Sequence, residues 1–189
     1  MRYPTVSDTI SMVSDTVLNE MSFSSWLKQF ARRDSSLGGG AAAAACAAMA
    51  AALLQKLAST RSQQRALAGI RASCLRLGRE DGDAFGRAVR LRQACRTMAF
   101  RRALKQAIEV PYRVLVHTHT LETMCRRTRR TVAPQWASDL ACAQALARAS
   151  GRSARGFIRA NLAWLGDPAY TATVRRRLRH ASRTHARHR

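Results

Sequence analysis

The chain has 189 residues and a hydrophobic content of 47%, which is enough for one domain with a buried core and argues against wholesale disorder. Its net charge of +22 comes from 33 basic and 11 acidic residues, and such a field attracts polyanions, acidic lipid surfaces or anionic small molecules. An arginine-rich and alanine-rich composition with a solvated surface explains the charge equally well, so the charge identifies no partner.

The N-terminal 21 residues repeat the letters VSDT at a seven-residue interval, and we expect them to form an arm outside the folded domain. The first twenty residues do not show a basic segment followed by an apolar one, which is the pattern of a secretory signal. The apolar stretch Ala41–Leu54 is shorter than the roughly 18 residues that cross a bilayer. The five cysteines are odd in number and widely spaced, as free thiols in a reducing compartment would be. These features predict a cytoplasmic protein without a membrane segment.

From residue 22 onward, apolar residues recur at intervals of three and four, which is the helical period, and no useful run alternates as a strand does. We expect helix ends at Gly78, near Pro111 and near Gly151. Asp167 is expected to cap a short last helix that starts at Pro168. The predicted fold is an all-α, antiparallel bundle of about six helices over residues 22–178, followed by a basic tail over 179–189.

A glycine triplet at residues 38–40 precedes the run of alanines at residues 41–45. Bare glycine backbone lets a ligand or another chain segment approach closely, and alanine favours helix while leaving room for a neighbouring helix. Close packing of this alanine face against another subunit and packing within the chain's own core are equal interpretations.

Acidic residues are scarce, so each one is noticeable. Asp81 and Asp139 lie near expected turns and helix starts, where a carboxylate can stay ionised or pass on a proton. The histidines show no catalytic pattern, and no spacing of cysteines and histidines predicts a metal site. The arginine-rich C-terminal residues could bind nucleic acid loosely, without sequence specificity.

Five segments together resemble the cyclodeaminase/cyclohydrolase family of folate enzymes. In chain order they are WLKQFA with SSLGGGAAAAACAAMAAAL, then DGDAFGRAV, ALKQAIEVPYRV, ASDLACAQAL and RANLAWLGDPAY. The resemblance covers about residues 22–175. It implies either cyclodeamination of formimidoyltetrahydrofolate with release of ammonia, or hydrolysis of methenyltetrahydrofolate, by a homodimer without a metal.

The resemblance also implies roles for individual residues. Asp81 and Asp139 would stabilise a cationic, tetrahedral centre and shuttle a proton. The substrate-binding residues it suggests are Gly38, Gly39, Gly40, Ser138 and Asn161. We therefore expect both acids and the glycine backbone to converge around one flat ligand.

Several positions depart from the family pattern. Leu37 stands where proline is usual, and Phe157 stands where asparagine is expected. STRSQQR replaces a lysine-containing loop, and the glycine–asparagine pair before the serine–aspartate is missing. These departures favour one alternative, a catalytically inactive family member that binds folate or serves as a structural dimer. The arginine-rich tail supports another, a basic helical protein that binds nucleic acid non-specifically.

Overall fold

The structure is a computed structural model that describes residues 22–35 and 37–186. The predicted arm at residues 1–21 and the last three residues of the predicted tail lie outside the described residues. The chain divides into two units, residues 1–35 and 36–189, and each is considered by itself.

The first unit contains one described helix, α2, which spans Phe23–Phe30. The Ser22 hydroxyl caps it by accepting the Ser25 amide at 3.2 Å. The rings of Trp26 and Phe30, four residues apart, meet edge to face with centroids 4.5 Å apart. This aromatic pair confirms the helical period that the sequence shows here.

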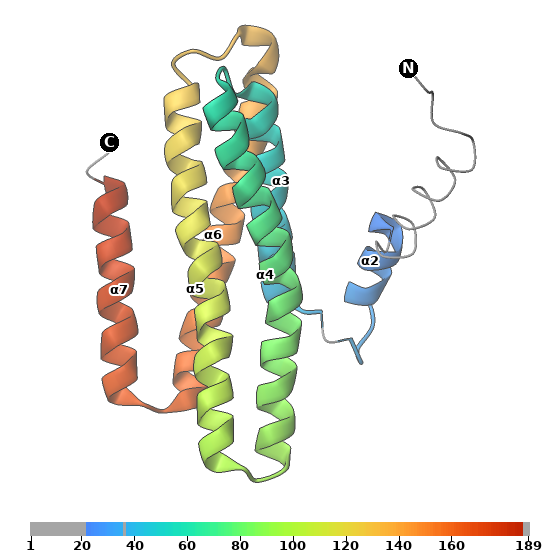
Figure 1. Ribbon diagram of the computed structural model, residues 1–189, viewed down its shortest axis with the longest axis vertical. Coiled ribbons are helices and arrows are strands. Elements are labelled where there is room, and N and C mark those ends of the chain that lie inside the picture. The colour runs from blue at the N-terminus through green and yellow to red at the C-terminus, as the bar shows by residue number, and fades with distance from the viewer. Residues whose placement is uncertain (1–21, 36, 187–189) are drawn as a thin grey trace, which may run out of the picture. The chain divides into compact units, whose positions relative to one another are not determined.

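The second unit is an up-and-down bundle of α3 (Gly39–Leu57), α4 (Arg61–Gln93), α5 (Thr97–Thr128) and α6 (Ala137–Leu165), as Figure 1 shows. A short 3-10 turn, Pro134–Trp136, leads into α6, and α7 (Pro168–Ala186) lies beside α5. The described residues contain no strand. The prediction of an all-α helix bundle is confirmed.

The central helix is α3, which packs against α4, α5 and α6. Its core residues are almost all alanine and glycine, and Leu54 is the largest of them. Small side chains let α3 approach all three neighbours closely. By length and composition α3 alone among the described helices could cross a membrane, but its small residues form the core of this bundle.

The expected helix ends at Gly78 and Gly151 are wrong, because α4 and α6 continue through both residues. Both glycines are buried at helix crossings. A Cβ on Gly151 would lie 3.0 Å from the Thr118 hydroxyl oxygen of α5, and one on Gly78 would lie 3.5 Å from the Ala41 carbonyl oxygen of α3. These glycines therefore serve close packing between helices and do not end a helix.

The expected break near Pro111 is also wrong, because α5 runs straight through this buried proline. A proline inside a helix leaves the carbonyl four residues earlier without its usual donor, and here that carbonyl belongs to Ala107. The side-chain amide of Asn161, on α6, donates to the Ala107 oxygen at 3.1 Å. A neighbouring helix thus replaces the missing hydrogen bond.

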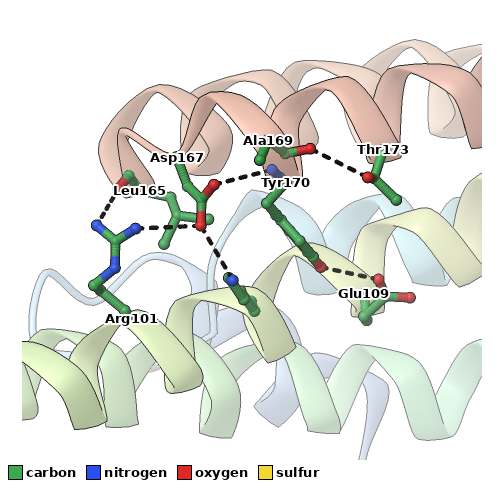
Figure 2. A network of polar contacts seen from close by, with 8 residues as sticks. Arg101, Glu109, Leu165, Asp167, Ala169, Tyr170 and Thr173 are labelled. Atoms are coloured by element: carbon green, nitrogen blue, oxygen red, sulfur yellow. Dashed lines mark hydrogen bonds and ion pairs between the residues drawn. The ribbon is translucent and has the colours of Figure 1, made fainter.

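The last helix is attached to α5 by a network of polar contacts (Figure 2). Asp167 accepts the Tyr170 amide at 2.9 Å, which confirms the predicted cap, and it also accepts from Arg101 and Lys105 at 3.2 Å each. Farther along α7, Arg177 donates twice to Glu109, at 2.5 and 2.8 Å. Instead of a short helix, α7 has 19 residues and continues past residue 178.

Candidate functional site

The carboxyl group of Asp81, on α4, faces the first turn of α3. A Cβ at residue 40 would lie 2.3 Å from an oxygen of this carboxyl group, so a side chain there would displace the carboxyl group from its position. The backbone amide of Ala41 donates to the Asp81 carboxyl. Gly38, the N-cap residue of α3, has no side chain that could accept such a bond. Asp81 therefore caps α3 from the neighbouring helix.

Burial raises the pKa of Asp81 from its ordinary value of 3.8 to about 6, although the Ala41 amide acts in the opposite direction by favouring the ionised form. The positive end of the α3 dipole also favours the carboxylate. A carboxyl group with a pKa near 6 can bind and release a proton close to neutral pH. This is the range in which a general acid or base is most effective.

The three glycines of the candidate site have different surroundings. A Cβ added to Gly38 would meet open space, and one on Gly39 would lie 2.5 Å from the ring of Phe157, on α6. Gly40 faces Asp81, as described above. The expected bare backbone is therefore present at Gly38, whereas Phe157 covers part of Gly39.

An exposed aromatic pair lies one helical turn away from these residues. Phe85 is four residues after Asp81 on α4, Trp164 is three residues after Asn161 on α6, and their ring centroids are 5.8 Å apart. Phe85 is 44% exposed and Trp164 39% exposed. Neither was predicted as a site residue, although their helical spacing from Asp81 and Asn161 was a usable signal.

Ser138 and Asp139 lie in the first turn of α6, whose N-cap residue is Trp136, so neither of them is the N-cap residue of this helix. The Lys56 ammonium group, at the end of α3, donates to the Asp139 carboxylate at 2.8 Å. The same ammonium group lies 4.1 Å from the centre of the Trp136 ring. Lys56 was missed by the sequence analysis, although lysine is rare in this chain.

The two predicted acids are at opposite ends of α3. Asp81 lies at Gly40, and Asp139 lies at Lys56. The distance from Gly40 to Lys56 along α3 is about 24 Å at a rise of about 1.5 Å per residue. Contrary to expectation, one chain does not bring Asp81 and Asp139 together. It does bring Asp81 to the glycine triplet, while Asn161 lies one turn beyond Phe157 and uses its amide to bind Ala107.

Within residues 22–35 and 37–186, no three histidine, cysteine, aspartate or glutamate side chains gather as they would around a metal ion.

Comparisons with known proteins agree with this architecture. A solved formiminotetrahydrofolate cyclodeaminase from Thermotoga maritima shares 19% sequence identity with this chain, and the match covers 90% of this chain and 93% of that one with a TM-score of 0.79. At this identity the likeness shows the fold alone. No curated protein matches the sequence. The model of one family, described as formiminotransferase-cyclodeaminase, matches residues 22–180. Because this match spans most of the sequence, the chain belongs to the formiminotransferase-cyclodeaminase family.

Proposed function

We propose that this chain acts on a tetrahydrofolate derivative that carries a formimidoyl or methenyl group, and that Asp81 is its acid–base residue. Membership of the family supports a folate-related function. The observation that carries the assignment to Asp81 is its half-buried carboxyl group at the N-terminus of α3, with a pKa of about 6.

Both candidate reactions need a proton to be moved at one carbon centre. In cyclodeamination, a second nitrogen of the folate attacks the formimidoyl carbon, closes a ring and loses its proton, and the departing nitrogen takes up a proton as ammonia leaves. In hydrolysis, water adds to the methenyl carbon and loses a proton. A single carboxyl group that titrates near pH 6 can donate the proton in the first case and accept it in the second.

The surroundings of Asp81 also suit a flat and cationic ligand. The ionised carboxylate would stabilise positive charge on the reacting carbon. The exposed rings of Phe85 and Trp164 offer an apolar surface against which a fused ring system can stack. We propose that the pterin ring lies between this aromatic pair and the glycines, with Gly38 as the open approach.

One observation favours a second candidate, a family member that binds folate without turnover. The Phe157 ring lies against Gly39, where the resemblance leads us to expect an asparagine. A phenyl ring forms no hydrogen bond and narrows the approach to the glycine backbone. Binding would then persist on the aromatic surface while the reacting carbon is no longer positioned.

The predicted homodimer and the predicted attachment of polyanions to residues 175–189 stay proposals. Light scattering over a range of protein concentrations tests the dimer. Polyanion affinity that falls steeply with salt and disappears when residues 175–189 are removed would support the nucleic-acid alternative.

Loss of the near-ultraviolet absorbance of methenyltetrahydrofolate tests the proposed function. The test variant is Asp81→Asn, which keeps an oxygen to accept the Ala41 amide but cannot exchange a proton. The control is Asp83→Asn, an exposed position two residues along the same helix. We expect the control to keep turnover and the test variant to lose it by about 100-fold or more.

The outcomes separate the candidates. Equal rates in the two variants would remove Asp81 from the reaction. If the unmodified chain binds methenyltetrahydrofolate but does not hydrolyse it, formimidoyltetrahydrofolate is tried next with ammonia as the readout. Binding of both compounds without turnover would establish the second candidate in place of the first.

A further inference from the structure

A pocket of about 240 Å³ lies between α5 and α6, away from Asp81. His119 and Glu122 line it from α5, and Gly151 and three arginines line it from α6. The arginines are Arg148, Arg152 and Arg155, whose spacing of four and three places them on one face of the helix. The pocket is thus defined by a cationic stripe facing one buried histidine and one acid.

The pocket is separate from the candidate folate site. Phe157 touches the first turn of α3, whereas Arg155 reaches α5, so the two residues lie on different sides of α6. Pockets that hold a drug-sized ligand usually measure about 300–1,000 Å³, and this one is smaller. A small ligand fits it better than a whole folate molecule does.

His119 fixes the position of one guanidinium group. Arg155 donates to the Nε2 atom of His119 at 2.9 Å. Arginine has no acceptor, so Nε2 must be the accepting nitrogen and the ring proton resides on Nδ1. The His119 side chain is only 8% exposed, which limits its motion. Arg155 is therefore held in place before any ligand arrives.

The charges around the pocket do not cancel. Three guanidinium groups face the single carboxylate of Glu122, which leaves two positive charges. Within the described residues, neither Arg148 nor Arg152 forms an ion pair, and both reach solvent. Guanidinium groups bind carboxylate and phosphate oxygens in pairs, through two parallel hydrogen bonds.

We propose that the pocket between α5 and α6 binds a small oxyanion with two or more negative charges, held by Arg148, Arg152 and Arg155. Phosphate and carboxylate ligands share this chemistry. A dianion would balance the excess charge, and Gly151 contributes no side chain that would fill the space.

Titration calorimetry on the full chain at constant ionic strength tests the proposal, with inorganic phosphate in one arm and citrate in the other. The test variant is Arg152→Gln. The matched control is Arg159→Gln, which removes the same charge from an exposed position of α6 outside the pocket. We expect saturable binding of at least one anion per chain, weakened about tenfold or more by the test variant alone.

Each outcome either supports or overturns the proposed oxyanion site. Saturable binding of phosphate only, or of citrate only, supports the proposal and identifies the oxyanion. Equal weakening in both variants would mean that the net charge of the chain attracts the anions, which overturns the proposal. Absence of saturable binding for both anions also overturns it.

Discussion

The carboxyl group of Asp81 occupies the space that a side chain at Gly40 would need, and it accepts the amide of the next residue in α3. This contact between α4 and α3 joins a structural role to a chemical one. The carboxyl group caps a helix that lacks a cap of its own, and its burial brings its pKa to about 6.

Two alanine substitutions test the different surroundings of Gly40 and Gly38. Gly40→Ala forces the new methyl group into the Asp81 carboxyl, and we expect it to destabilise the fold by about 1–3 kcal/mol. Gly38→Ala adds a methyl group in open space at a φ of −125°, so its effect should be within about 1 kcal/mol and can be stabilising. Urea denaturation measures both, and similar losses in the two variants would contradict the contact.

The raised pKa of Asp81 predicts a pH-dependent stability. At pH values between 3.8, the ordinary pKa of an aspartate, and about 6, the folded chain binds more protons than the unfolded chain. The contribution of Asp81 to the free energy of unfolding is therefore fully present below pH 3.8. Up to about 3 kcal/mol of it is lost as the pH rises through 6. The free energy of unfolding of the unmodified chain should fall relative to that of Asp81→Asn between pH 4 and pH 7. A constant difference would show that burial does not perturb this carboxyl group.

The ion pair of Lys56 and Asp139 should contribute little to stability. The Lys56 side chain is 50% exposed, and water and salt screen such a pair. We expect Asp139→Asn to change the free energy of unfolding by less than about 1 kcal/mol. Because Asp139 lies far from Asp81, we also expect any folate turnover to stay within several-fold of the unmodified rate. Loss of turnover in a folded Asp139→Asn variant would mean that a second chain brings Asp139 to the site.

The sequence predicted the helical period and the capping role of Asp167, because each depends on neighbours within a few residues. It misplaced the helix ends at Gly78, Pro111 and Gly151. At these positions local propensity favours a break, but packing against another helix outweighs it. The partners involved are distant in sequence, so local patterns did not reveal them.

Contacts between residues distant in sequence also decide which parts of the candidate site could be predicted. Asp81 was recognised because a carboxylate is rare in so basic a chain, and the structure places it beside the predicted glycines. Asp139 was recognised for the same reason. Its distance from Asp81 depends on which end of α3 each helix meets, and this topology is not encoded in the spacing of either motif.

The hydrogen bond from Asn161 to Ala107 predicts a thermodynamic coupling between Asn161 and Pro111. Asn161→Ala leaves a carbonyl of a buried residue without its donor and should cost about 1–3 kcal/mol. Pro111→Ala supplies a backbone amide at residue 111, which can bond to the Ala107 carbonyl as in an ordinary helix. The cost of Asn161→Ala should therefore be smaller by about 1 kcal/mol in the Pro111→Ala background.

A double-mutant cycle measured by urea denaturation gives this coupling directly, because packing losses at Asn161 appear in both backgrounds and cancel. Equal costs in the two backgrounds would show that Asn161 does not compensate for the proline. Its side chain would then be available for the folate-orienting role that the resemblance implies, which makes the cycle informative about the site as well as the fold.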